Sequence, residues 1–423
     1  MTPIALRFRE TFESLRSRNF RLFFLGQLVS VTGTWVQQVA AAWLVLRLTS
    51  SGVMLGIDTG LTFLPMLLFG FWGGALADRR DKRQILVVTN TAYGVLALVL
   101  WALVATDTVQ LWMVFVLSFL SGTVAAIDAP TRQSFYAEMV HDDHIVNAVS
   151  LNSAVMTGTR IIGPAIAAAL IASFGLEWCF LVNGVSYIAA IIGLGRMRVD
   201  ELNRQHRAGQ RTRLRETLAY VRSDEALWLP LVLMGVLFLF TFNFSVTVPL
   251  LAERTFAGGI GTFGTFLAVL GAGSFIGALG MARVTGPNIR RLSWFAIAVG
   301  VASVLVGASP TRPVVVVALG VLGFAMMVFM ITGNSGLQLA TRPEMRGRVM
   351  AIYSIVFLGG TPIGAPLTGL VAEHIGPRAA MAGAGAIAVV AGAVTLRYLR
   401  RRAIVEDTGE IEGAGEAFST VEA

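Results

Sequence analysis

Two ionisable side chains lie inside long apolar stretches of the sequence, where a charge is unusual. Asp58 falls within 53–77, and Arg160 lies near the middle of 146–174. A charged side chain at that depth of an apolar helix is costly and usually faces a bundle interior or a water-filled cavity. We expect both residues to line or gate a polar cavity and to take part in proton coupling, with Asp58 as the proton carrier. The structural alternative is that Arg160 bonds helix carbonyls and Asp58 pairs with Arg47.

Uncharged polar side chains also occur deep in the apolar stretches, and each could hydrogen-bond a ligand or a neighbouring helix. In the second half of the chain, aromatic and methionine side chains are expected to face the centre. Such surfaces adapt to large apolar ligands, although ordinary packing is the alternative for any one of them. The predicted cavity residues are Gln37, Gln38, Asn183, Asn243, Phe244, Met330, Asn334, Tyr353 and Phe357.

A cluster of charges follows the second apolar stretch, in the sequence GALADRRDKR. Asp78 ends this apolar helix beside four cations, and Asp128 ends another helix on the same side. We expect Lys82 to pair with Asp128, with Asp78 nearby, so that the charges latch neighbouring helix ends. The alternative is solvated charge that only anchors the loop. The predicted latch residues are Gly74, Asp78, Arg79, Lys82, Arg83 and Asp128.

The composition places these residues in a membrane protein. Hydrophobic residues make up 55% and charged residues 14% of the 423 residues, whereas soluble proteins carry about 25% charged residues. So few charges could not cover the surface of a soluble protein of this size. A soluble enzyme, a disordered chain and a disulfide-rich secreted scaffold are therefore excluded. We predict an all-α protein that crosses the bilayer repeatedly and is not an enzyme.

Residue counts narrow the function further. Lys82, the only lysine, follows Asp81 and precedes Arg83, so the chain lacks the Gly-Lys-Ser/Thr loop that cradles nucleotide phosphates. Cys179 is the only cysteine, which leaves no disulfide or thiolate zinc site within one chain. The segment His141–His144 is better explained by surface polarity or helix capping than by metal binding. Scattered basic residues argue against nucleic acid, and no cofactor or metal is expected.

Long apolar runs could each cross a bilayer, which takes about 20 residues. Of the Lys and Arg residues, 28 lie on the side of the two termini, 4 lie on the other side, and Arg160 lies inside a run. Because basic loops stay on the cytoplasmic side, both termini are predicted to be cytoplasmic. The twelve predicted transmembrane helices are 20–46, 53–77, 85–105, 111–127, 146–174, 178–195, 227–251, 261–282, 292–308, 314–340, 349–371 and 379–399.

The twelve runs form two sets of six. At an offset of 201 residues, Gly163 aligns with Gly364 and Gly175 aligns with Gly376. A parallel repeat of this kind is typical of membrane bundles whose halves rock around a site at mid-membrane. The predicted organisation is a cytoplasmic leader at 1–19, helix bundles at 20–195 and 227–399, a cytoplasmic linker with a short amphipathic helix at 196–226, and a disordered cytoplasmic tail at 400–423.

The segment 74–83 resembles the signature loop of the major facilitator superfamily, Gly-x-x-x-Asp-Arg-x-Gly-Arg-Arg, with Asp81 in place of the glycine. The resemblance covers about 20–402 and implies the major facilitator fold of two pseudo-symmetric six-helix halves, with this loop as a conformational latch. The segment 158–168 is similar to the antiporter motif of the family's exporters, which ends Gly-Pro-x-x-Gly-Gly, with alanines at the last two positions. Small-residue packing is the alternative. The motif residues are Gly158, Arg160, Gly163 and Pro164.

Further segments are similar to the branch of the superfamily that includes enterobactin exporters and macrolide-efflux proteins. The resemblance implies secondary active export of bulky small molecules (drugs, siderophore-like or other secreted metabolites) by alternating access and proton antiport. A facilitator or importer on the same fold and a non-transporting receptor or scaffold are the alternatives. The implied partners are a small-molecule substrate, protons and the lipid bilayer, without nucleic acid or nucleotide, for a monomer in the bacterial inner membrane. The segments similar to this branch are 128–133, 147–152, 160–164, 343–349 and 361–364.

Overall fold

A computed structural model describes residues 13–203, 214–281 and 288–419, without the side chains at 142, 145, 146, 150, 153, 154, 157, 214 and 403–419. Within these ranges the regular structure is entirely helical. The first half contains α2 (Arg18–Thr49), α3 (Gly52–Arg79), α4 (Lys82–Ala105), α5 (Leu111–Met139), α6 (Ile145–Ser173) and α7 (Glu177–Gly195). The second half contains α9 (Glu225–Phe240), α10 (Phe244–Leu250), α11 (Gly259–Met281), α12 (Ile289–Ala308), α13 (Arg312–Ala340), α14 (Arg346–His374) and α15 (Pro377–Ser419).

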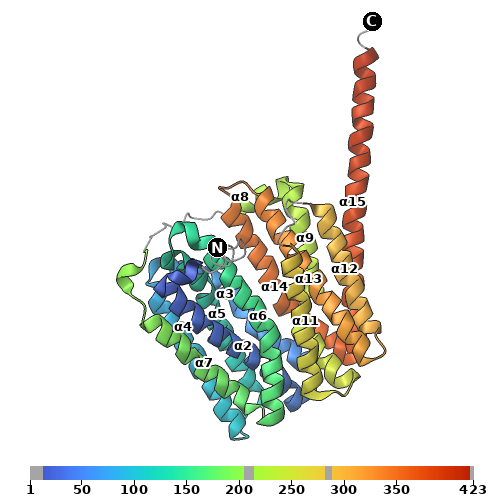
Figure 1. Cartoon of the computed structure of the whole chain (residues 1–423). Helices are drawn as coiled ribbons and strands as arrows, with labels where there is room; N and C mark the ends of the chain where they lie inside the picture. Colours follow the sequence, from blue (N-terminus) through green and yellow to red (C-terminus); the bar gives the residue numbers. More distant parts are fainter. Residues whose placement is uncertain (1–12, 204–213, 282–287, 420–423) are drawn as a thin grey trace, which may run out of the picture.

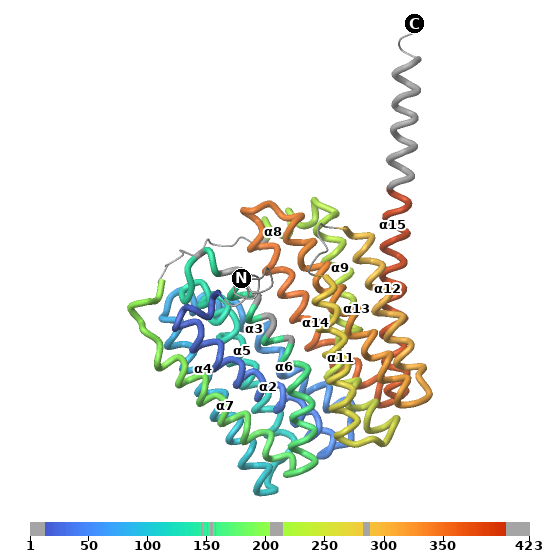
Figure 2. Tube along the Cα trace, viewed as in Figure 1, coloured from blue at the N-terminus to red at the C-terminus, as the bar shows by residue number. Residues whose placement is uncertain are grey.

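The two halves stand side by side. Helices α2–α7 form one side of the molecule and α9–α15 form the other (Figure 1). Figure 2 shows the chain in blue and green through the first half and in yellow to red through the second. Helix α3 contacts α14, and α6 contacts α11, so these two pairs join the halves.

Eleven helices of the described residues are long and apolar enough to cross a membrane. Helix α6 adds a shorter apolar helix at Gly158–Ser173. The predicted runs therefore correspond to helices along the described chain, while the count of twelve membrane crossings stays a prediction.

The predicted span at 227–251 lies within the candidate span Glu225–Thr255, but its helix is interrupted. Helix α9 ends at Phe240, α10 begins at Phe244, and a π-helical turn follows at Leu251–Thr255. The Asn243 side chain donates a hydrogen bond of 2.8 Å to the carbonyl of Leu239, which occupies one of the acceptors that a helix end leaves free. Pro249, which lacks an N–H, lies inside α10 just before the π-helical turn.

The two halves repeat the same packing pattern. Helix α3 packs on α5 as α11 packs on α13, and α4 packs on α7 as α12 packs on α15. The glycines aligned at the offset of 201 have nearly the same backbone, with φ of +113° at Gly175 and +114° at Gly376. This left-handed conformation at a helix end favours glycine, which explains why both positions carry it.

Short helices cover one end of the bundle, which we call the α8 end. The predicted amphipathic helix is present as α8 (Leu214–Ser223), with Val221 buried and Leu218 38% exposed. The guanidinium of Arg342 lies 5.9 Å over the ring of Tyr220, so α8 rests on the connection between α13 and α14. Most of the tail that is predicted to be disordered lies outside the residues whose side chains are described.

Candidate functional site

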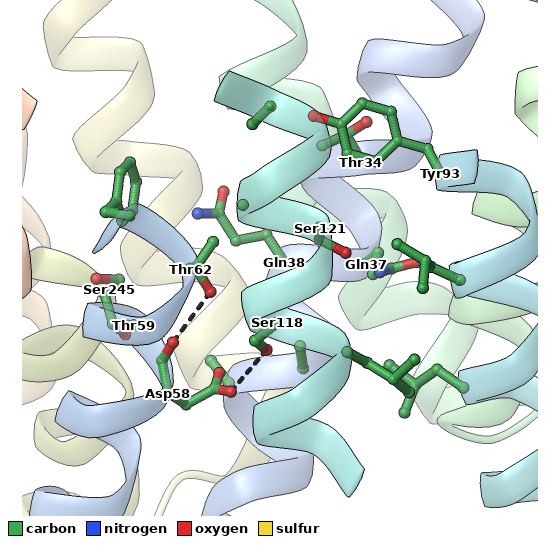
Figure 3. A pocket seen from close by; sticks show the side chains of 18 of the residues that line it. Thr34, Gln37, Gln38, Asp58, Thr59, Thr62, Tyr93, Ser118, Ser121 and Ser245 are labelled. Atoms are coloured by element: carbon green, nitrogen blue, oxygen red, sulfur yellow. Dashed lines mark hydrogen bonds between the residues drawn. The ribbon is translucent and has the colours of Figure 1, made fainter. Parts of the chain in front are cut away.

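A cavity of about 250 Å³ lies inside the first half. Its walls come from α2, α3, α4, α5 and α7, and one residue of α10 closes it from the second half (Figure 3). Three of the predicted residues, Gln37, Gln38 and Asn183, line it together with Asp58. The polar lining residues are Thr34, Gln37, Gln38, Asp58, Thr59, Thr62, Tyr93, Ser118, Ser121, Asn183, Tyr187 and Ser245.

Asp58 is the only carboxylate in this lining, and it is 6% exposed. The Ser118 hydroxyl donates a hydrogen bond of 2.7 Å to one carboxylate oxygen, and the Thr62 hydroxyl donates one of 3.0 Å to the Asp58 backbone carbonyl (Figure 3). In the part of the chain that the structure describes, no cation forms an ion pair with Asp58. The alternative of a pair with Arg47 is therefore not what the structure shows.

Hydrogen bonds fix the wall made by α2 and α7. The Asn183 amide donates to the Gln37 side-chain oxygen over 2.7 Å. The hydroxyls of Thr34 and Tyr187 lie 3.0 Å apart, and the Tyr187 ring stacks on Tyr93 with 5.4 Å between centroids. These contacts hold polar groups around the cavity in fixed directions, which favours recognition of a ligand over mere filling of space.

Arg160 is not among the residues that line this cavity. Its guanidinium carbon lies 5.5 Å over the ring of Trp35 on α2. The cause is the packing of α6: a Cβ at Gly163 would overlap Trp35, and the backbone carbonyl of Arg160 lies against Gly271 of α11. The antiporter-like segment thus forms the seam between α2, α6 and α11.

The second-half residues predicted for the cavity lie elsewhere. Gln338 donates a hydrogen bond of 2.6 Å to the Asn334 side chain. The Tyr353 and Phe357 rings stack at 6.2 Å, and both contact Phe238. Six predicted residues are therefore absent from the lining of this cavity, because contacts within the second half occupy them or because they pack in its core: Asn243, Phe244, Met330, Asn334, Tyr353 and Phe357.

The charged loop at the α8 end forms an ion pair other than the one predicted. Lys82 pairs with Glu138 near the end of α5, and the two side chains are only 13% and 12% exposed. Asp128 lies further inside α5, where it is 1% exposed. The Lys82–Asp128 pair is thus a wrong prediction: α5 continues beyond residue 127 to Met139 and brings Glu138 to the lysine.

Asp128 has its own partners inside the first half. It forms an ion pair with Arg132 one helical turn later, and the Thr89 hydroxyl donates to its other oxygen over 2.8 Å. Arg132 in turn donates to the Gln27 side chain over 2.8 Å. This chain of contacts ties α2, α4 and α5 together.

The remaining loop residues divide into two groups. The Arg83 guanidinium donates to the carbonyls of Leu194 and Gly195 over 2.6 and 3.1 Å, where a cation stabilises the C-terminal end of α7. Asp78 and Arg79 are exposed, and a Cβ at Gly74 would meet nothing within 4 Å. The loop therefore binds its own half in this structure.

Separate loss of Lys82 and Glu138 should destabilise the fold by about 1–3 kcal/mol each, because the pair is mostly buried and removal of either partner leaves the other charge without its counter-ion. In the charge-swapped double variant, Lys82→Glu with Glu138→Lys, most of that stability should return. The measurement is a double-mutant cycle of thermal unfolding in detergent. The control cycle combines Lys82→Gln with Asp128→Asn, and the stability losses of these two variants should add. A coupling energy larger in this cycle than in the Lys82–Glu138 cycle would contradict the Lys82–Glu138 pair.

At the end opposite α8, which we call the Ser51 end, the halves meet at the level of the backbone. A Cβ at Gly56 of α3 would overlap the carbonyl oxygen of Ala365 on α14, and one at Gly369 would overlap the carbonyl of Gly52. The Glu373 carboxylate accepts hydrogen bonds from the Ser51 hydroxyl at 2.6 Å and the Val53 amide at 2.9 Å. A residue of the second half thus caps the first turn of α3.

Several of these residues were missed in the sequence. Ser118, Tyr93 and Glu373 come from helices other than that of Asp58, and nothing in their local sequence marks them. Thr62, however, follows Asp58 by four residues and Thr59 by three, so it neighbours both on the surface of α3. That pattern could have identified the α3 wall of the cavity.

The chain is similar to bacterial export proteins over most of its length. A family model described as transmembrane secretion effector matches residues 9–410. A macrolide efflux protein A of Streptococcus pyogenes is 22% identical over 84% of this chain and 90% of its own. A multidrug efflux pump, Tap, of Mycobacterium tuberculosis is 24% identical over 89% and 92%. A staphyloferrin A transporter of Staphylococcus aureus is 24% identical over 62% and 67%.

Solved structures share the fold. A bacterial homologue of the human lysosomal transporter Spinster superimposes with a TM-score of 0.73 over 93% of this chain and 98% of its own, at 16% identity. The nucleoside transporter NupG gives 0.72 over 90% and 99%, at 12% identity. The resemblance drawn from the signature loop is confirmed. The chain belongs to the transmembrane secretion effector family of the major facilitator superfamily and is a multi-pass transporter of the bacterial inner membrane.

Proposed function

We propose that the protein exports bulky small molecules by alternating access, driven by the inward movement of protons. The observation that carries the proposal is a polar cavity with one buried carboxylate, enclosed in an apolar bundle whose two halves are sealed together at one end. The names of the relatives, two efflux proteins and a siderophore transporter, support export of drugs or siderophore-like metabolites.

The proposed orientation places the α8 end in the cytoplasm. Support comes from the basic residues: the twelve predicted crossings put 28 of the 33 on the side of the two termini, which is the pattern of cytoplasmic loops. With twelve crossings, both termini then lie in the cytoplasm and the Ser51 end faces outward.

In this orientation, we infer a conformation that is open toward the cytoplasm. The α3–α14 seam is tight at Gly56 but loosens along α3, since a Cβ at Gly70 or Gly74 would meet nothing within 4 Å. Phe71 and Trp72 on the same stretch are 79% and 64% exposed. During alternating access, α3 and α14 would close together near Gly70 and Gly74 and separate at the Ser51 end. The 74–83 loop would then act as the latch of the closed α8 end.

Asp58 is the proposed site of proton exchange. A buried carboxylate without a cation can hold a proton in one conformation and release it in another, because its surroundings decide which form is favoured. Arg160 is proposed to act from the α2–α6–α11 seam, where the motif residues Gly163 and Pro164 pack, by changing its contacts as the halves move.

Everted membrane vesicles test the proposal. Vesicles from cells that overproduce the protein should accumulate a substrate when the lumen is acidic, and a protonophore should stop the uptake. The probes are a labelled macrolide, the organic cation ethidium and a labelled siderophore, with empty-vector vesicles as the control. Uptake that ignores the gradient would indicate a facilitator, movement in the opposite direction would indicate an importer, and no flux of any probe would indicate a receptor or scaffold.

A further inference from the structure

The cavity in the first half is asymmetric in charge. Its 22 lining residues include one carboxylate, that of Asp58, and no lysine, arginine or histidine. Other nearly buried acids of the same half have a cation: Asp128 pairs with Arg132 and Glu138 pairs with Lys82. Among the described residues, Asp58 thus differs from them in having no cation within ion-pair distance.

The hydrogen bonding of Asp58 is also incomplete. An ionised carboxylate can accept about four hydrogen bonds, and Ser118 supplies the one found among the described residues. Burial of a charge is costly unless a partner offers opposite charge or donors. A ligand with an ammonium or another positively charged group would supply what the protein does not.

The rest of the lining suits the apolar body of such a ligand. Leu55, Phe63, Met66, Leu96, Leu100 and Leu117 contribute apolar surface. The stacked rings of Tyr93 and Tyr187 add aromatic faces, which attract cations at short range. An anion would instead meet the Asp58 charge with no cation in the lining to offset it.

We propose that this cavity binds an amphipathic organic cation, with Asp58 as its counter-ion and the α3–α4–α5 wall around its apolar part. The proposal rests on the proposed export function and names the substrate class. A volume of about 250 Å³ lies just below the usual range of ligand pockets, about 300–1,000 Å³, so only the cationic head of a larger substrate would enter and the rest would stay outside the cavity.

Tetraphenylphosphonium and tetraphenylborate provide a matched test, since they are nearly equal in size and shape and opposite in charge. Binding of each labelled ion is measured on the purified full chain in detergent. The native protein should bind the phosphonium, and Asp58→Asn should weaken that binding about tenfold or more. Asp58→Glu should keep part of it, and Glu177→Gln, a neutralised acid of α7 outside the lining, should bind within twofold of the native protein.

The binding and transport results together distinguish failure of the cation site from failure of the export function. Binding of the borate as tight as that of the phosphonium, or phosphonium binding that is unchanged in Asp58→Asn, would overturn the assignment of a cation site. Thermal unfolding of every variant shows whether a loss of binding is a loss of fold. If vesicles take up a probe in response to the gradient but the protein binds the phosphonium and the borate equally, the cation site is refuted and the export function is not. Charge-selective binding without flux would refute the export function instead.

Discussion

Replacement of Asp58 by asparagine should abolish the acceleration of efflux by a proton gradient. Asparagine has the same shape and can still accept the hydrogen bond of Ser118, so the cavity should persist, but it cannot bind and release a proton. We expect the initial rate of uptake into everted vesicles to fall at least about tenfold, a typical scale for loss of an essential proton-transfer group, and to become equal with and without an acidic lumen.

The matched control is Glu177→Gln, which removes a carboxylate of the same half from outside the cavity lining. It should retain the stimulation by the gradient. Vesicles with equal amounts of folded Asp58→Asn protein that still respond fully to the gradient would show that another group carries the proton.

Introduction of a large side chain at Gly56 should open the Ser51 end. A Cβ alone would overlap the carbonyl oxygen of Ala365, and overpacking of a tight contact costs about 1–3 kcal/mol. Since about 1.4 kcal/mol changes a population ratio tenfold, Gly56→Leu should shift the protein toward the conformation in which this seam is parted. We expect gradient-driven transport to fall by a similar factor, because the closed seam is one of the two states that export requires.

The shift can be measured with a cysteine at Thr59, which is 8% exposed and lines the cavity, in a chain that carries Cys179→Ser. A membrane-impermeant thiol reagent applied from the Ser51 side should label this cysteine slowly in the native sequence. Labelling should be about tenfold faster with Gly56→Leu. Gly70→Leu lies in the same helix at a position where a Cβ meets nothing within 4 Å, and it should not accelerate labelling; equal acceleration by both variants would contradict the seam.

The sequence was sufficient to predict the helices because apolar length and charge spacing determine them almost locally. The boundaries of α3 and α4 follow from Ser51 and Asp81, whose side chains accept hydrogen bonds from the first turn of each helix. The break at Thr241–Asn243 could not be predicted from hydropathy, since 227–251 is apolar throughout most of its length. The close approach of α14 at Gly364 to Leu239, a tertiary contact, coincides with the break.

The candidate site was predicted in part for the same reason. Asp58, Gln37 and Asn183 were found because a polar residue inside an apolar run is visible in the sequence. The partners of Lys82 and Asp128 were not found in the sequence. Asp128 and Glu138 both lie on α5, and which of them reaches Lys82 depends on where that helix ends. Arg160 was assigned to the cavity from depth alone, whereas the packing of Gly163 on Trp35 turns its side of α6 toward α2.

Transport by the purified chain in liposomes tests the central claim most directly. Native and Asp58→Asn proteins are reconstituted separately, without ATP or any other protein, and a pH jump makes the lumen acidic while ethidium is present outside. For the molecules inserted with the α8 end outward, the account predicts ethidium accumulation that requires the pH jump, coincides with alkalinisation of the lumen and is absent with Asp58→Asn. Ethidium accumulation at the same rate without the pH jump, or equal gradient-driven accumulation by both proteins, would contradict it.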